Sequence, residues 1–325
     1  MPKKSVHSSG SSNDASRRET SSTRRPPPPS VLGDLKILAY VVGLGIIYLI
    51  FSTMNFLPQN RPPLDNRIAF VTGSTGATGR SIVAQLANKD WTVYALTRKS
   101  TDDKLELFPE LSSNNLDKVQ IVFEPDPESW SRQVPLPLPE KLDAVFLCHG
   151  TSREYADVQT DIAGNGQEGF AKWLQRVDVD ITSRVAFAAI ENRVRVIARI
   201  SASHADPDHD PEALGGFGLY FKYQGIADQA LIEMQKEEMK SADASRILIF
   251  RPGSLDRGEE KRATRPWEQE IARKGERKTM PVGLLASAII RQAEVNLLWD
   301  NVVAAGSNKI FSYDEMWSIV NDLEL

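Results

Sequence analysis

The sequence predicts an α/β fold built on a doubly wound parallel sheet, and three observations support this class. From residue 67 onward, short apolar runs of strand composition alternate with segments of helical periodicity. The first two runs flank a glycine-rich turn and a helix within about 30 residues, which is a βαβ unit. The single cysteine, Cys148, excludes an internal disulfide framework, so a hydrophobic core must hold the fold.

The individual elements follow in order along the chain. Strand composition predicts six strands: Arg67–Gly73, Trp91–Arg98, Val119–Phe123, Leu142–Gly150, Val194–Ser201 and Arg246–Phe250. Helical spacing predicts helices over Arg80–Asn88, Glu168–Asn192, Tyr220–Met239, Val282–Trp299 and Tyr313–Leu323. Gly258–Lys278 is charged and loop-like. Ligands of such a sheet bind at the carboxyl ends of its strands.

The residues before this domain have a different composition. Residues 1–35 are rich in Ser, Arg and Pro and predict a disordered tail. Within residues 36–57, Ile37–Leu57 is 21 residues without a charge, long enough for one transmembrane helix. Residues 58–66 form a linker, and 67–325 form the Rossmann-like domain. A buried core helix and a cleaved signal sequence are the alternative interpretations of the apolar run.

The side of the membrane on which the domain lies stays open. Five Lys/Arg residues precede the apolar run closely and two follow it, which keeps the tail on the cytosol- or matrix-like side. The lack of disulfides and of Asn-x-Ser/Thr sites favours the opposite orientation of the domain. We expect a single-pass protein of the mitochondrial or endoplasmic reticulum membrane. Because basic residues concentrate in the tail and the remainder is acidic, we expect no nucleic-acid partner; protein partners stay unknown.

A glycine triplet stands where a dinucleotide-binding turn belongs, after the first strand and at the start of the first helix. Glycines at three-residue spacing permit a tight turn and close approach of a pyrophosphate to the helix N-terminus. Arg80 follows the last glycine and can reach a phosphate. The predicted cofactor-binding residues of this turn are Gly73, Ser74, Thr75, Gly76, Ala77, Thr78, Gly79 and Arg80.

Three further strand ends extend the predicted site. The second strand ends in Thr97-Arg98-Lys99 with no carboxylate before Asp102, and a basic residue here favours NADP(H) over NAD(H). Two later strands are followed by Gly150-Thr151 and Pro252-Gly253, which we expect to contact the cofactor. The segment His204–Asp210 contains two His and three Asp but lacks paired ligand spacing, so we expect no metal site.

Several motifs together resemble the atypical short-chain dehydrogenase/reductases, and most closely the HIV-1 Tat-interacting protein (oxidoreductase) family. The motifs are TGSTGATGR, LTRK, FLCHGTSR, RVDVD, ISASHAD, LYFKYQG and IFRPGSL, within about residues 65 to 300. The resemblance implies that Ser201 orients a carbonyl, that Tyr220 is the general acid/base, and that Gln224 stands at the position of the catalytic lysine.

This glutamine leaves two functions open. Glutamine can bond to a ribose but supplies no positive charge to lower the pKa of the tyrosine. Lys222 cannot replace the lysine because it points about 200° away from Tyr220 around the helix. The chain is therefore either an NADPH-dependent reductase of a carbonyl-type substrate or a catalytically weak NADP(H)-binding scaffold, assembly or redox-sensing protein. A nucleic-acid role has no basic surface to support it.

Overall fold

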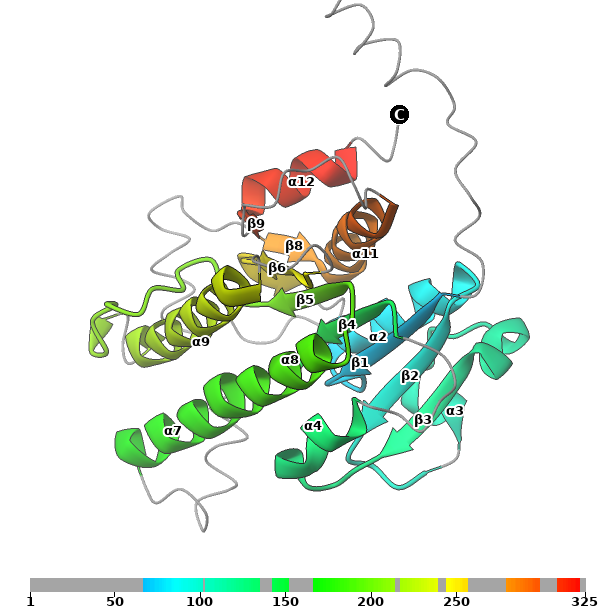
Figure 1. Ribbon diagram of the computed structural model, residues 1–325, viewed down its shortest axis with the longest axis horizontal. Helices are drawn as coiled ribbons and strands as arrows, with labels where there is room; N and C mark the ends of the chain where they lie inside the picture. Colours follow the sequence, from blue (N-terminus) through cyan, green and yellow to red (C-terminus); the bar gives the residue numbers. More distant parts are fainter. Residues whose placement is uncertain are drawn as a thin grey trace, which may run out of the picture. The chain divides into compact units, whose positions relative to one another are not determined.

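The computed structural model describes residues 67–101, 103–134, 142–151, 166–213, 217–238, 244–256, 279–298 and 309–321 (Figure 1). All of them belong to one unit, Arg61–Leu325. The predicted tail, membrane helix and linker lie outside the described residues, as does the charged segment Gly258–Lys278. Among the helices that are described, none is long and apolar enough to cross a bilayer.

The main sheet has seven parallel strands in the order β3-β2-β1-β4-β5-β6-β9. Strand order reverses between β1 and β4, so the carboxyl ends of these two neighbours form the switch point of a doubly wound sheet. A separate parallel pair joins β7 to β8. The strands are β1 Ile68–Thr72, β2 Thr92–Thr97, β3 Val119–Phe123, β4 Ala144–Leu147, β5 Val196–Ile200, β6 Arg246–Phe250, β7 Ser254–Asp256, β8 Thr279–Pro281 and β9 Lys309–Phe311.

Helices connect the strands and cover both faces of the sheet (Figure 1). The α-helices are α2 Ala77–Asn88, α3 Lys104–Leu107, α4 Trp130–Gln133, α7 Gly166–Leu174, α8 Thr182–Glu191, α9 Phe217–Glu238, α11 Val282–Leu298 and α12 Tyr313–Asn321. Two short 3₁₀ turns, η1 Ser113–Lys118 and η2 Pro127–Ser129, and a π-helical segment, η3 Gln175–Ile181, complete the set.

Two hydrophobic layers follow from the alternation of side chains along the strands. In β1, Ala69 and Val71 point to a layer shared with α2, α11 and α12, whereas Ile68 and Phe70 point to a layer shared with α4, α8 and α9. All four side chains are buried. The first strand is therefore apolar at every position, as a strand of a parallel sheet covered on both faces must be.

The predicted α/β doubly wound sheet is confirmed, with some differences of detail. The six predicted strands form, but β9 adds a seventh, and the β7–β8 pair was not predicted. Each of these strands has only three residues, too few for a periodic pattern. The predicted helix Glu168–Asn192 forms from α7 to α8, but its middle is the π-helical η3.

Candidate functional site

In the turn between β1 and α2, the backbone packs closely against itself and against the backbone of His149. Gly73 has φ of +60°, and a Cβ on it would lie 2.5 Å from the backbone nitrogen of His149. A Cβ on Gly79 would lie 2.2 Å from the carbonyl oxygen of Gly73. Both distances are far below van der Waals contact, so the turn requires glycine at these two positions. Gly76 is exposed between them, with only the Gly73 carbonyl oxygen near its missing Cβ, at 3.3 Å.

The N-terminus of α2 is open toward a ligand. Gly76 is its N-cap residue and makes no side-chain capping bond, and the first turn holds no acidic side chain. The first amides of a helix have no intrahelical acceptor, and the helix dipole adds positive potential there. A pyrophosphate fits this end because the exposed Gly76 lets it approach the backbone amides.

Other residues of the predicted turn have different surroundings. The Ser74 hydroxyl is buried and donates to the carbonyl oxygen of Leu96 at 2.6 Å, which ties the turn to β2. Thr78 is buried, whereas Thr75 and Ala77 are half-buried. Arg80 is half-buried, and its Nε lies 3.6 Å from a carboxylate oxygen of Glu110. Contact of Arg80 with a phosphate stays a prediction.

The end of β2 presents basic side chains next to the glycine turn. Thr97 is buried, and its hydroxyl accepts a hydrogen bond from the backbone N–H of Lys99 at 3.0 Å. Arg98 and Lys99 are exposed. Since β1 and β2 are paired in parallel, these cations lie at the same sheet edge as the N-terminus of α2.

His149 joins the glycine turn to the loop after β4. Its Nδ1 lies 2.7 Å from the Thr72 hydroxyl and its Nε2 lies 2.9 Å from the Thr182 hydroxyl. Burial, together with the nearby Arg199 cation, lowers the pKa of His149 to about 3. The imidazole is therefore neutral at physiological pH, and with one N–H it donates to one threonine and accepts from the other. This arrangement fixes the ring at the switch point of the sheet.

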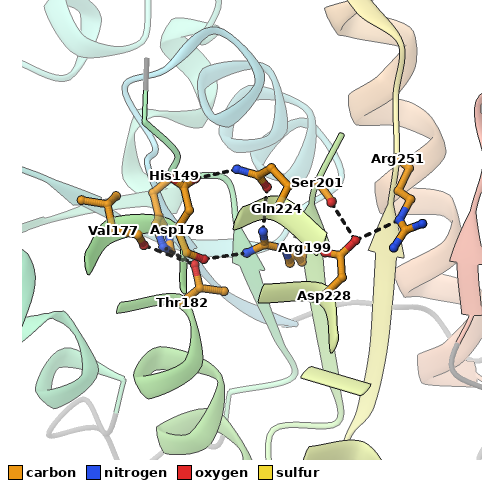
Figure 2. A network of polar contacts seen from close by, with 9 residues as sticks. All are labelled: His149, Val177, Asp178, Thr182, Arg199, Ser201, Gln224, Asp228 and Arg251. Atoms are coloured by element: carbon orange, nitrogen blue, oxygen red, sulfur yellow. Dashed lines mark hydrogen bonds and ion pairs between the residues drawn. The ribbon is translucent and has the colours of Figure 1, made fainter. Parts of the chain in front are cut away.

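A buried polar network occupies the adjacent part of the site, with Arg199 between Gln224 and Asp228 (Figure 2). Arg199 is the one charged residue of β5 and only 2% exposed. Its Nε donates to Asp228 Oδ1 at 2.9 Å and its Nη2 donates to Gln224 Oε1 at 2.7 Å. Asp228 also accepts from the Ser201 hydroxyl at 2.8 Å and from Arg251 Nε at 2.9 Å. The Asp228 carboxylate thus accepts hydrogen bonds from two guanidinium groups and one hydroxyl.

Asp178 ends the network on the side of the glycine turn. It comes from η3, the π-helical segment, and its Oδ1 accepts from Gln224 Nε2 at 2.7 Å and from the Thr151 amide at 3.4 Å. Burial raises the pKa of Asp178, while the Thr151 hydroxyl and the Arg199 cation oppose this rise. Thr151 Oγ1 and Asp178 Oδ2 are both buried, and neither has a hydrogen-bond partner of regular geometry within the described ranges.

The three predicted catalytic residues lie in the same region with different accessibility. Tyr220 is half-buried in the first turn of α9, and Gln224 follows one turn later on the same face, buried. Ser201 is also buried, and its hydroxyl donates to Asp228. Because Asp228 lies eight residues after Tyr220, their backbones are separated by about 12 Å along the helix axis. Ser203, two residues after Ser201, is exposed in the same loop.

The remaining predicted contacts lie on two loops at the carboxyl edge of the sheet. Gly150 is exposed after β4, and a Cβ on it would lie 3.4 Å from Asp178 Oδ1, an ordinary contact. After β6, Pro252 is buried and accepts from the Ser203 amide at 3.0 Å, while Gly253 is half-buried. In the described part of the chain, no group of three or more His, Cys, Asp or Glu side chains could hold a metal ion.

Four residues were not predicted from the sequence as members of one site: Arg199, Asp228, Asp178 and His149. A signal for Arg199 was present, because a charged residue inside an apolar strand such as VIARI must be paired when buried. The sequence signal for Asp228 was weaker: this residue lies one turn after Gln224 on the same face of the predicted helix. No local pattern indicates the bond between Gln224 and Asp178, which are 46 residues apart.

The parallel doubly wound sheet and its glycine turn define a Rossmann-like protein that binds a nicotinamide dinucleotide. The chain belongs to the NAD(P)H-binding family, whose model matches residues 73–294. This match covers the glycine turn, the network and α11 up to Glu294. No curated protein gives a significant match.

Solved structures share this fold at low sequence identity. A short-chain dehydrogenase/reductase mutant from Serratia marcescens is 16% identical, with a TM-score of 0.59, and the alignment covers 78% of this chain and 100% of that one. A short-chain dehydrogenase from Streptomyces avermitilis is 16% identical, with a TM-score of 0.53 and coverage of 80% and 93%. Serine dehydrogenase from Escherichia coli is 14% identical, with a TM-score of 0.51 and coverage of 75% and 95%. At these identities the likeness concerns the fold alone.

Proposed function

We propose that the chain is a membrane-anchored NADP(H)-binding protein that acts as a scaffold, assembly or redox-sensing protein rather than as an efficient carbonyl reductase. One observation carries the second part of this proposal. Gln224, at the position where the resemblance puts a lysine, is buried and uses both ends of its amide inside the protein. Gln224 is only 2% exposed, so a ribose could reach its second N–H or its second oxygen lone pair only if the network moved.

The surroundings of Ser201 and Gln224 support the same conclusion. In the family that the chain resembles, a lysine at the position of Gln224 supplies a positive charge that favours the phenolate of the catalytic tyrosine. The cation closest to Gln224 is Arg199, which is already paired with the Asp228 carboxylate. The single proton of the Ser201 hydroxyl is also directed to Asp228, so Ser201 has no proton left to orient a carbonyl.

A reductase is the second candidate, and the position of Tyr220 favours it. Tyr220 is half-buried on the same face of α9 as Gln224, one turn nearer to the helix N-terminus. From there a phenol can donate a proton during carbonyl reduction without first becoming a phenolate. The exposed Ser203 would then replace Ser201 beside the substrate.

The deciding experiment measures binding and turnover on the same purified full-length protein. NADPH is titrated by its fluorescence, and consumption is then followed with a panel of aldehydes and ketones. We expect saturable binding with turnover no faster than in a Tyr220→Phe variant. Turnover that Tyr220→Phe abolishes would establish the reductase instead, and absence of binding would refute both functions.

The proposed preference for NADP(H) depends on Arg98 and Lys99. Their charges are exposed at the end of β2, where the 2′-phosphate of a dinucleotide held by the turn would lie. We expect Arg98→Ala to weaken NADPH binding about tenfold and to leave NADH binding unchanged. Equal affinities for NADH and NADPH, both insensitive to this substitution, would refute the preference.

Membrane anchoring through Ile37–Leu57 and a mitochondrial or endoplasmic reticulum location complete the proposal. Their support is the uncharged apolar run, which is long enough to span a bilayer as one helix. Carbonate extraction of membranes and protease protection of tags at both ends test them. Release of the full-length chain by carbonate would refute the anchor.

A further inference from the structure

We propose that Arg199 is a positioning residue for the nicotinamide half of the bound dinucleotide, acting through Gln224 and Asp178 on the loop formed by Gly150 and Thr151. The proposal rests on the dinucleotide binding proposed above. It assigns a role to a buried cation that the glycine turn does not require.

The first step is the fixed position of Arg199. Its guanidinium bonds to α9 at two side chains, Asp228 and Gln224, and its Nη1 donates to the carbonyl oxygen of Asp178 in η3 at 3.3 Å. With three bonds to two elements and an exposure of 2%, the group cannot turn without leaving buried partners unsatisfied. Arg199, which lies in β5, therefore connects this strand to both α9 and η3 through hydrogen bonds.

The second step is the orientation of the Gln224 amide. A guanidinium has only donors, so the amide end that faces Arg199 must be the carbonyl oxygen. The NH₂ group then points to the acceptor on the other side, Asp178 Oδ1. If Arg199 were replaced by an apolar residue, the amide would keep its bond to Asp178 but lose the partner that fixes its oxygen end.

The third step leads from Asp178 to the loop after β4. Asp178 Oδ1 accepts from the Thr151 amide and lies against Gly150. This loop follows the strand beside β1, at the switch point where a dinucleotide crosses from the first half of the sheet to the second. Two buried atoms without partners, Asp178 Oδ2 and Thr151 Oγ1, lie here, where a hydroxyl-bearing ligand group can satisfy them.

The other end of the network keeps the arginine in place. Asp228 is fully buried, and a buried carboxylate without its cation is strongly unfavourable. Arg251 and Ser201 occupy its Oδ2, which leaves Oδ1 to Arg199. A lysine cannot reproduce this geometry, because it lacks the planar fork that reaches Asp228 and Gln224 together.

The test compares two probes on the full-length protein, NADPH and adenosine 2′,5′-bisphosphate, which has no nicotinamide half. The variants are Arg199→Met and Gln224→Met. The second cuts the connection to Asp178 but retains the pair of Arg199 with Asp228, so it remains informative if Arg199→Met fails to fold. Arg195→Met is the matched control: Arg195 directly precedes β5 and donates to the carbonyl oxygen of Leu297, remote from the network.

We expect both network variants to bind NADPH about tenfold more weakly and adenosine 2′,5′-bisphosphate with unchanged affinity. The control should bind both probes as the natural protein does. Equal weakening of both probes would show that Arg199 is merely structural, and unchanged NADPH binding in Gln224→Met would also overturn the proposal. If the natural protein binds neither probe, the proposed function itself fails.

Discussion

The two halves of the candidate site differ in the kind of polar side chain that each of them buries. Within β1, β2, α2 and the glycine turn, the buried polar side chains are neutral hydroxyls, those of Thr72, Ser74, Thr78 and Thr97. Around β5, α9 and β6 the protein buries full charges, Arg199 and Asp228, with Asp178 beside them. The shape of the first half depends on the backbone of the glycine turn, where side chains are absent. The shape of the second half depends on side chains that form ion pairs and hydrogen bonds with one another.

This difference follows from the charge of the ligand. A pyrophosphate brings its own negative charge to the helix N-terminus, so the first half needs amides and space but no buried cation. The second half buries charges that must balance one another, since each unpaired charge is unfavourable in the interior. We therefore expect steric substitutions to damage the first half and charge substitutions to damage the second.

The largest expected effect is the loss of the shared carboxylate. Asp228→Leu leaves Arg199 as a buried unpaired cation, and we expect it to lower the free energy of unfolding by about 3–5 kcal/mol. Urea unfolding followed by circular dichroism measures this. Glu168→Ala, which breaks the exposed pair with Lys172, is the control and should leave it essentially unchanged. If Asp228→Leu lowered the free energy of unfolding by less than about 1 kcal/mol, the expected sensitivity of the second half to charge substitutions would be refuted.

A steric substitution probes the first half. In Gly79→Ala the new methyl group would lie 2.2 Å from the Gly73 carbonyl oxygen, so the turn must open. We expect a loss of about 3 kcal/mol of stability and of measurable NADPH binding. Gly283→Ala is the matched control, because Gly283 is exposed in α11 with no atom within 4 Å of the new methyl group. NADPH binding unaffected by Gly79→Ala would contradict the proposed cradle.

A charge substitution at Gln224 tests the second half. Gln224→Lys restores the residue type that the resemblance places at this position. The structure predicts destabilisation by about 2 kcal/mol, because the ammonium would meet the Arg199 guanidinium where the amide oxygen now accepts its bond. In the double variant Arg199→Met/Gln224→Lys we expect less loss than the sum of the two single changes. Additive changes in the unfolding free energy would disprove this coupling.

The smallest expected effect concerns pH. The folded-state pKa of His149 is about 3, below its ordinary value of 6.5, so only the unfolded chain takes up this proton as the pH falls through 6.5. The resulting stability is present above pH 6.5 and declines toward pH 3. Between pH 6.5 and 5 we expect a loss of about 1.5 kcal/mol, absent in His149→Asn. Parallel pH profiles of the two proteins would show that the imidazole is not held neutral.

Most of the fold could be predicted from local patterns. Buried strands and tight turns restrict which residues can occur within them. The apolar run IAFVT therefore predicts a strand, and the spacing of Gly73, Gly76 and Gly79 predicts a turn. The three-residue strands β7, β8 and β9 could not be predicted, because their pairing partners, rather than any periodicity, make them strands.

The network shows why the rest of the site escaped prediction. Gln224 was assigned its position by resemblance, at a place where the family has a lysine. What takes up the space and charge of that lysine depends on Arg199, 25 residues away, and on Asp178. Neither partner could be chosen from the sequence, since many polar residues lie at similar separations.

The sequence by itself determined the order of the six longer strands, the glycine turn and the basic end of β2, because each of these depends on residues that are neighbours in the chain. Only the tertiary structure decided that Ser201, Gln224, Arg199 and Asp228 form one buried network. The reason is physical: a buried charge is stable only beside its partner, and parallel strands bring partners together from distant parts of the chain.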